Sequence, residues 1–381
     1  MSDGDRPPDP GAMSAEEMIA LTRKHTMFSW VAQHSAKPIA MDTAKGSWFT
    51  SVDGKRYLDF NSQAMSVNIG HGDERVADAI AEQARKLAYA YPHAAHEPRA
   101  RLGQRLAQLT PGDLDVMFFT TGGAVANDMA IKLARQYTGR QKIMARYRSY
   151  HGATGQAMVA TGDPRRWANE VGSAAIVRVP EAHRYGRKDP EPVETALDDL
   201  EEVIMFEGAH TIAAILLEPV VGANGILIPP DGYMQGVREI CDRHGILLIA
   251  DEVMSGFGRT GKWFAVEHWG VVPDLITMGK GLTSSYVPLG AVAIRREIAD
   301  AFNSEPFFGG LTYHSHPLGC ATALAVIDVY ELDGLIERSA RLGELMRQHH
   351  ERLYEVHPSV GTHRNIGLFG IMVLVLDRES Y

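Results

Sequence analysis

The chain has 381 residues, of which 45% are hydrophobic, and its 47 acidic residues outnumber 38 basic ones to give a formal net charge of −9. This length is enough to bury a large core and exceeds one compact unit, while the negative balance argues against a nucleic-acid binder, which would carry a basic patch. Two cysteines imply no disulfide framework, and no apolar stretch approaches the length of a membrane span, so we expect a globular cytoplasmic protein, most simply an enzyme.

The chain begins with a polar stretch rich in proline and glycine, which predicts a disordered lead over 1–13. Next, "GSWFTSVDGKRYLDF" predicts a β-hairpin that turns at Asp53-Gly54. From about residue 74, helical patterns alternate with short apolar runs whose continuous apolar character suits a parallel sheet covered on both faces. The strand candidates are "DVMFF" (115–119), "KIMAR" (142–146), "AAILLE" (213–218), "ILLIAD" (246–251), "LITM" (275–278) and "AVAI" (291–294).

Between two of these runs, "DGYMQGVREICDRHG" predicts a helix that starts at Asp231 and ends just before Gly245. After about residue 322 the pattern is helical again, and "VLV" (373–375) predicts a strand of a second, smaller domain. Alternating strands and helices indicate a doubly wound α/β domain, which binds ligands beyond the carboxyl ends of its strands.

The carboxyl ends of parallel strands lie at one edge of a sheet, so we expect the residues that follow each apolar run to lie close together. In "TTGGAVANDMAIKLARQY" a strand ends at Thr120-Thr121, two glycines turn, and a helix follows. Free N–H groups and the positive dipole end of such a helix suit a phosphate, although an ordinary tight turn fits the same pattern.

Charged side chains follow three other runs. Glu218 and Asp251 end apolar strands, and Lys280 follows "LITM" between two glycines. A solvated loop lysine is the simplest interpretation of Lys280 alone. Just past the 142–146 run, Tyr150 and His151 place an aromatic ring where a flat cofactor could stack.

A phosphate-binding turn, an aromatic ring that can stack on a cofactor, a carboxylate and a lysine together suit one cofactor, pyridoxal 5'-phosphate (PLP). PLP needs its phosphate held, its aldehyde captured by a lysine amine, and its pyridine nitrogen kept protonated beside an acid. The lysine acts as a nucleophile only when it is neutral, which desolvation favours. The sequence therefore predicts a PLP enzyme in which the glycines allow close approach to Lys280.

The chain resembles the class III aminotransferases, which have the PLP fold type I. The resemblance covers 120 to about 325 through "TTGGAVAND", "YRSYHGAT", "LLEPVVGANG", "LLIADEVMSGFGRTGKWFA", "PDLITMGKGLTSSYVPLGAV" and "GLTYHSHPLGCATALAV". It implies an α/β fold with a mainly parallel PLP-binding large domain (76–322) flanked by helices. It also implies a smaller α/β domain built from both termini (14–75 and 323–381), the second part of which we expect to be incomplete.

The same resemblance implies roles for individual residues. Lys280 is similar to the Schiff-base lysine, Asp251 to the partner of the pyridine nitrogen, and Thr312 to the threonine that reaches the phosphate of the neighbouring subunit. A homodimer with shared active sites follows, and a tetramer stays open. The cofactor-binding positions implied are Gly123, Ala124, Tyr150, His151, Glu218, Asp251, Val253, Lys280 and Thr312, and the substrate positions are Trp30 and Tyr150.

One segment departs from the family pattern. Where many members carry Ser-Gly-Ser-Glu-Ala-Asn-Glu, residues 122–128 read Gly-Gly-Ala-Val-Ala-Asn-Asp. The missing hydroxyls shift the expected phosphate binding toward backbone N–H groups and Thr312, and the pattern gives no reason for Val125.

The predicted reaction moves an amino group from an amine or omega-amino acid to pyruvate or 2-oxoglutarate in two half-reactions. Another PLP enzyme of the same class (aminomutase, decarboxylase or epimerase) or a catalytically silent PLP-fold partner stays open. "GFGRTG" (256–261) matches a dinucleotide-binding pattern, but the candidate ribose acid Asp274 begins its strand, and Asp251 would repel a pyrophosphate. The histidine pairs 93/96 and 314/316 match no metal motif, so we expect no metal.

Overall fold

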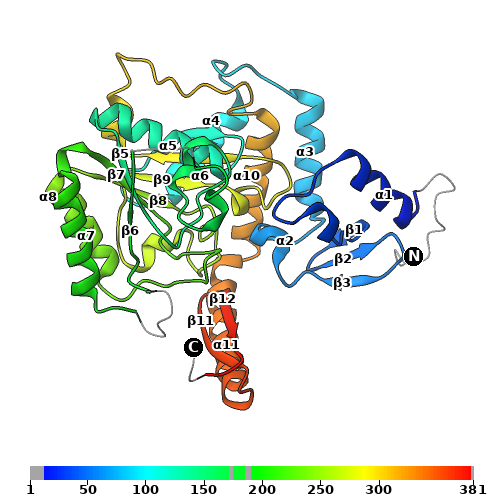
Figure 1. Cartoon of the computed structure of the whole chain (residues 1–381). Helices are drawn as coiled ribbons and strands as arrows, with labels where there is room; N and C mark the ends of the chain where they lie inside the picture. The colour runs from blue at the N-terminus through cyan, green and yellow to red at the C-terminus, as the bar shows by residue number, and fades with distance from the viewer. Residues whose placement is uncertain (1–12, 171–174, 185–189, 379–381) are drawn as a thin grey trace. The chain divides into compact units, whose positions relative to one another are not determined.

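The computed structural model describes residues 13–170, 175–184 and 190–378, so the predicted disordered lead lies almost wholly outside the described residues. The chain divides into two compact units, one of residues 13–64 with Gly70–Glu74, and one of Met65–Ile69 with the chain from Arg75 onward (Figure 1). This division leaves 323–378 with the larger unit. The small domain assembled from both termini stays a prediction.

The N-terminal unit contains the predicted hairpin. Strand β2 (Trp48–Ser51) pairs antiparallel with β3 (Arg56–Leu58), and Gly54 turns the chain in the left-handed region at φ +80°. A third strand, β1 (Met41–Lys45), pairs with β2 and was not foreseen. Helix α1 (Ala15–His25) precedes the strands and is capped by the Ser14 side chain, which accepts a hydrogen bond from the Glu17 N–H.

The larger unit is built on a seven-stranded sheet in the order β4-β10-β9-β8-β7-β5-β6. Each predicted run is a strand, and the register pairs show that all run parallel except β10. The strands are β4 (Val116–Thr120), β5 (Lys142–Arg146), β6 (Ile176–Val179), β7 (Ile212–Leu217), β8 (Leu247–Asp251), β9 (Leu275–Met278) and β10 (Gly290–Ile294).

Two details of the sheet differ from the sequence prediction. Strand β10 is antiparallel to both neighbours, because only a single 3-10 turn, η5 (Lys280–Leu282), lies between β9 and β10, whereas a parallel return needs a long crossover. Strand β6 was not foreseen, since it has only four residues and an arginine interrupts its apolar run.

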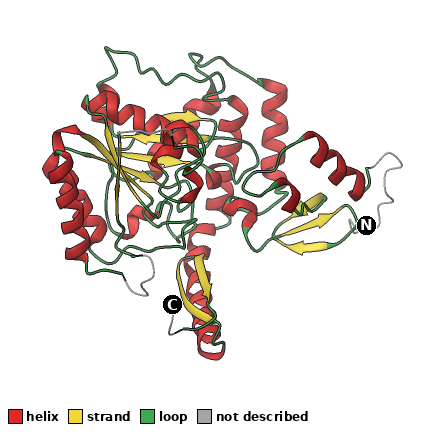
Figure 2. Ribbon diagram, viewed as in Figure 1, coloured by secondary structure: helices red, strands yellow, loops and turns green. Residues whose placement is uncertain are grey.

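Side chains of the central strands alternate between two cores, one on each face of the sheet. The ribbon diagram shows helices packed around this sheet (Figure 2). In β7, Ala214 and Leu216 pack with α5 (Gly123–Thr138), whereas Ile215 and Leu217 pack with α8 (Tyr233–His244). The prediction of a sheet covered on both faces is confirmed. The remaining helices are α2 (Ser62–Met65), α3 (Glu74–Lys86), α4 (Glu97–Leu109), α6 (Gly155–Ala160), α7 (Val193–Glu207), α9 (Arg296–Asp300), α10 (Pro317–Leu332) and α11 (Leu335–Val356).

Helix α8 begins two residues later than the sequence indicates, because Gly232 at the N-cap adopts φ +87°. It ends as predicted at Gly245, which is left-handed. After α11, strands β11 (Val360–Ile366) and β12 (Phe369–Leu374) form an antiparallel hairpin, so a strand lies close to the predicted "VLV" run. Across the part of the chain that the structure describes, no helix combines the length and apolarity that crossing a membrane requires.

Candidate active site

The five predicted strand ends meet at one edge of the sheet. Strands β4, β5, β7, β8 and β9 all run in the same direction, so their carboxyl ends lie together. Asp251 is the last residue of β8, and the segments after β4, β5, β7 and β9 carry Gly123, Tyr150, Glu218 and Lys280, respectively. The structure therefore brings together residues that are up to 157 positions apart in the sequence.

Asp251 is the most fully bonded side chain of this edge. It is 3% exposed. Its Oδ2 accepts a hydrogen bond from Asn127 Nδ2 at 2.8 Å and lies 2.7 Å from His151 Nδ1. Its Oδ1 accepts bonds from the Val253 N–H at 3.1 Å and from Thr277 Oγ1 at 3.3 Å. These contacts fix the carboxylate in one orientation.

Sequence reasoning missed two members of this network, Asn127 and Thr277. Thr277 Oγ1 also donates to Asn127 Oδ1 at 2.8 Å, which orients the amide toward Asp251. In the sequence, Thr277 is a polar residue within the otherwise apolar strand β9, and Asn127 is a polar residue on the apolar face of α5. Such residues are equally common as satisfied core positions, so the pattern alone did not identify them.

His151 connects the aromatic segment to Asp251. Its ring is buried, its Nδ1 faces Asp251, and its Nε2 is enclosed without a hydrogen-bond partner among the described residues. Its main-chain N–H donates to Thr161 Oγ1 at 2.9 Å. His151 therefore positions the carboxylate and leaves one polar atom unsatisfied at the site.

Glu218 is buried after β7 and holds two backbone segments together. Its carboxylate accepts hydrogen bonds from the Tyr150 N–H at 3.0 Å and the Gly222 N–H at 2.8 Å. Burial raises the pKa of the Glu218 carboxyl, while nearby His151 acts in the opposite direction. Glu218 thus places Tyr150 at the edge and adds a titratable carboxyl beside Asp251.

Lys280 opens the turn after β9 with an unusual backbone. Its φ of +40° lies in the left-handed region, which costs a non-glycine residue about 1–3 kcal/mol and is typical of functional turns. Burial lowers the pKa of the Lys280 amine. The carboxylates of Asp251 and Glu218 act in the opposite direction on the pKa of this amine.

The glycines on either side of Lys280 permit close packing. A Cβ on Gly279 would lie 3.1 Å from the Gly123 nitrogen, and one on Gly281 would lie 2.5 Å from Asn68 Nδ2. Larger residues at either position would separate the lysine turn from its neighbours. The sequence-based reason for the Gly-Lys-Gly stretch, close approach, agrees with this packing.

The start of α5 forms a small-residue cradle. A Cβ on Gly123 would lie 2.6 Å from Val253 Cγ1, and one on Gly152 would lie 2.3 Å from the Ala124 Cβ. The first N–H groups of a helix have no partner within it, and the N-cap Gly122 supplies no side chain to cap them. This cradle fits a phosphate held by backbone groups.

The structure also accounts for two residues that depart from the family pattern. Val125 packs against the core cluster beneath α5. Asp128 accepts a hydrogen bond from the Ala157 N–H at 2.8 Å at the start of α6. Both contribute to packing around the cradle.

Arg165 is a site residue that sequence reasoning did not single out. Its guanidinium carbon lies 3.7 Å from the centre of the Tyr150 ring, and its Nε donates to Asp163 Oδ1 at 3.0 Å. Its charge acts on the Lys280 amine, whose pKa it helps to lower. The site therefore contains a cation above the ring that was expected to stack.

The geometry of this edge does not test the roles of two predicted residues. Trp30 belongs to the N-terminal unit and is 74% exposed with φ +62°. Thr312 is exposed, and its carbonyl accepts a hydrogen bond from the Tyr89 hydroxyl at 3.0 Å. The roles of both stay predictions.

The alternative motif at 256–261 lacks the helix that a dinucleotide site needs. These residues form turns, and the next helical segment is the short 3-10 helix η4 (Ala265–His268). Asp274 precedes β9 and accepts hydrogen bonds from Arg238 Nη1 at 2.8 Å and Arg295 Nη1 at 2.9 Å. Asp274 is therefore part of a structural ion-pair cluster.

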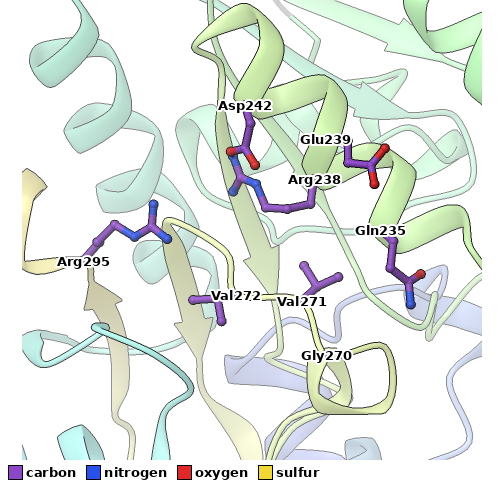
Figure 3. Close-up of a pocket in the computed structure, with 8 residues that line it drawn as sticks. All are labelled: Gln235, Arg238, Glu239, Asp242, Gly270, Val271, Val272 and Arg295. Atoms are coloured by element: carbon purple, nitrogen blue, oxygen red, sulfur yellow. The ribbon is translucent and has the colours of Figure 1, made fainter.

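That cluster borders a shallow cavity of about 370 Å³ at the amino ends of the strands (Figure 3). Arg238 also pairs with Asp242, at 2.7 Å, so the arginine charges there are already balanced. No group of three His, Cys, Asp or Glu side chains is arranged as metal ligands within 13–170, 175–184 and 190–378. The lining residues of the cavity are Gln235, Arg238, Glu239, Asp242, Gly270, Val271, Val272 and Arg295.

Comparisons with known proteins agree with the site. The family model "Aminotransferase class-III" matches residues 30–379. The omega-aminotransferase of Caulobacter vibrioides is 37% identical over 87% of this chain and 79% of its own length. The taurine–pyruvate aminotransferase of Bilophila wadsworthia is 32% identical over 96% of this chain and 83% of its own.

Solved structures of aminotransferases are also similar to this chain. The taurine:2-oxoglutarate aminotransferase from Bifidobacterium kashiwanohense, in complex with PLP and glutamate, has a TM-score of 0.94 and 39% identity over 97% of this chain and 84% of that one. An (S)-enantioselective omega-transaminase from Thermomicrobium roseum has a TM-score of 0.91 and 38% identity, covering 97% of this chain and 86% of that one. The chain belongs to the class III aminotransferase family.

Proposed function

We propose that this aminotransferase uses PLP to move an amino group from an amine or omega-amino acid to a keto acid, pyruvate or 2-oxoglutarate. The observation that carries the proposal is the placement of Lys280 at the same sheet edge as the buried, fully bonded Asp251 and the open start of α5. The named donors and acceptors of the relatives, taurine, pyruvate and 2-oxoglutarate, support the substrate class.

The residues present fit PLP. The Nε2 atom of buried His151 has no hydrogen-bond partner among the described residues and could bond to such a group. The small residues around Gly123 leave space for its phosphate. When bound, PLP supplies an electron sink that stabilises negative charge on the substrate carbon. We assign the phosphate to the N–H groups at the start of α5 and the ring to the space between Tyr150 and Val253.

Two side chains handle protons. Asp251, oriented by Asn127 and His151, would hold the proton on the pyridine nitrogen, because a fixed carboxylate favours that charged form. Lys280 Nζ is the amine that would hold the cofactor carbonyl when neutral, and it would serve as the base and acid at the donor carbon. Burial of the lysine favours the neutral amine that both tasks require.

Arg165 is proposed to attract the carboxylate of the keto-acid acceptor. It is the cation that lies over Tyr150, and its charge reaches Lys280. Asp163 already accepts a hydrogen bond from the Arg165 guanidinium. The carboxylate of the keto acid would therefore bind the same guanidinium alongside Asp163.

We also propose a homodimer in which Thr312 serves the phosphate of the partner subunit. Thr312 is exposed, as are its neighbours Phe308 and Tyr313, so the segment presents apolar surface that a second copy could cover. Both cysteines, Cys241 and Cys320, are free and buried, which supports the proposed cytoplasmic location.

A donor and acceptor screen tests the proposal. The purified protein with PLP is incubated with taurine, β-alanine or putrescine, each with pyruvate or 2-oxoglutarate, and the new amino acid is quantified. We expect alanine or glutamate to form only when donor and keto acid are both present. Conversion of a donor without any keto acid, in excess of the enzyme present, would favour the aminomutase, decarboxylase or epimerase alternatives, and no conversion of any donor would favour a silent partner protein.

A further inference from the structure

Arg259 is a partly buried cation without a carboxylate partner. Its Nη2 donates to Asn68 Oδ1, and its Nε is fully enclosed with no hydrogen-bond partner in the described part of the chain. No ion pair joins Arg259 to an acidic side chain of those residues, whereas Arg165 nearby pairs with Asp163. Buried charges are normally paired, so an unpaired one at the edge of an active site calls for a reason.

The amide of Asn68 links Arg259 to the lysine turn. Asn68 Nδ2 donates to the Phe257 carbonyl at 3.1 Å, and a Cβ on Gly281 would lie 2.5 Å from the same nitrogen. The Asn68 amide is therefore packed directly against the residue that follows Lys280. Arg259 Nη2 donates to the oxygen of the same amide.

Two more contacts hold the same turn. The hydroxyl of buried Tyr330 donates to the Gly281 carbonyl at 2.9 Å, and the Ile69 N–H donates to Ser284 Oγ at 3.1 Å. The turn needs such support, because Lys280, Ser284 and Ser285 all have positive φ.

The charges that act on the Lys280 amine are two carboxylates, Asp251 and Glu218, and two guanidiniums, Arg259 and Arg165. The carboxylates favour the protonated amine, which is not nucleophilic. Of the two cations, Arg165 is largely balanced by Asp163, so its field at a distance is weakened. Arg259 has no such counter-charge among the described residues, and in a low-dielectric interior its field persists.

We propose that Arg259 is a positioning residue of the aminotransferase reaction, whose unpaired guanidinium, anchored through Asn68 against Gly281, keeps the Lys280 amine neutral and fixes the turn that presents it. The inference rests on the proposed function, since it concerns the same lysine. It gives a reason for a cation at this edge without a carboxylate partner among the described residues, because a neutralised arginine could not offset the two acids beside Lys280.

The test is a spectroscopic pH titration of the holoenzyme. Arg259→Met removes the charge and keeps most of the volume, and the matched control Arg347→Met removes an exposed guanidinium on α11. We measure the pH midpoint at which the absorbance of the Lys280-bound cofactor changes between its protonated and unprotonated forms. Loss of a nearby positive charge should raise this midpoint by about one pH unit or more, whereas the control should match the wild type.

Two further variants separate charge from structure. Arg259→Lys keeps the charge, so its midpoint should stay near that of the wild type even if turnover falls. Asn68→Asp places a carboxylate against the guanidinium and should raise the midpoint as Arg259→Met does, which keeps the test decisive if Arg259→Met does not fold.

The outcomes distinguish this inference from the proposed function. A wild-type protein with no lysine-bound cofactor absorbance would contradict the proposed function itself. A wild type with that absorbance, together with folded Arg259→Met or Asn68→Asp proteins whose midpoints equal that of Arg347→Met, would overturn only the role of Arg259.

Discussion

The two edges of the central sheet use charge in opposite ways. At the amino edge, Asp274 pairs with Arg238 and Arg295, and Arg238 also pairs with Asp242, so positive and negative charges balance within hydrogen-bond distance (Figure 3). At the carboxyl edge, within the part of the chain that the structure describes, no cation is bonded to the carboxylate of buried Glu218 and Lys280 has no direct ion pair.

The difference indicates that the charged side chains at the amino edge stabilise the fold, whereas those at the carboxyl edge take part in function. A balanced cluster keeps ordinary protonation states and contributes to stability, whereas an unbalanced one shifts pKa values and can bind a charged ligand. The comparison predicts that substitutions at the carboxyl edge alter chemistry, and that equivalent substitutions at the amino edge alter stability.

The largest expected effect comes from Lys280→Ala. Removal of the amine should abolish transamination and the yellow absorbance of the lysine-bound cofactor, because no other described side chain at this edge supplies a primary amine. Cofactor could still bind through the α5 start. Absorbance spectra and product assays measure both effects.

Lys262→Ala serves as the matched control, because Lys262 contributes only a long bond of 3.4 Å to the Glu267 carbonyl. It should retain colour and turnover. If Lys280→Ala kept both, Lys280 would not be the cofactor lysine.

The next effect in size is expected for Asp251→Asn. The substitution keeps the shape but removes the charge that holds the pyridine proton, which should lower kcat on the order of 10²-fold or more. Steady-state kinetics with saturating PLP measure this directly. Turnover within a few-fold of the wild type would assign the proton to another acid.

Asp274→Asn makes the same chemical change at the other edge and sharpens the comparison. It leaves Arg238 and Arg295 without their shared carboxylate, and breaking such a partly buried pair should destabilise the fold by about 3 kcal/mol. We expect a lower Tm with kcat little changed. A large loss of kcat without a loss of stability would contradict the claim that charges at the amino edge serve stability rather than chemistry.

A smaller effect concerns the proposed sharing of sites between subunits. Thr312→Asp should weaken cofactor retention about ten- to a hundredfold, the value of one charge-assisted hydrogen bond of roughly 1.5–3 kcal/mol. Mixing it with inactive Lys280→Ala under subunit exchange gives mixed dimers with one site that has both defects and one that has neither.

Mixed dimers purified through two different tags should show about half the activity of a wild-type dimer. Thr312→Val, with a similar shape and no hydroxyl, controls for the added charge. If the purified mixed dimers are inactive, Thr312 acts within its own chain.

The smallest expected effect is a pH dependence from Glu252, beside Asp251. Burial raises the pKa of the Glu252 carboxyl to about 7, against an ordinary value of 4.5. Because the folded pKa lies above the unfolded one, this group stabilises the fold fully below pH 4.5, and its contribution is lost as the pH rises toward about 7.

Glu252→Gln should remove this dependence. Thermal unfolding between pH 4.5 and 7 should show the wild type losing Tm relative to the variant as the pH rises. Parallel curves for the two proteins would mean that Glu252 is ionised throughout.

The sequence by itself determined which residues end the strands. Apolar runs of four to six residues closed by Glu218, Asp251 and Lys280 could be identified because burial on both faces leaves a continuous apolar signal. Together with the glycine turn and the aromatic residue, these strand ends indicated the cofactor, and the family resemblance then assigned the individual roles.

Only the tertiary structure decided how the strands run and what surrounds the site. The direction of β10 depends on the short connection after β9, which an apolar pattern does not encode. Asn127, Thr277 and Arg259 reach the site through contacts 26 to 191 residues apart in the chain, such as that between Arg259 and Asn68. Local periodicity reports which face of an element is buried, whereas pairing between polar atoms depends on which elements the fold brings together.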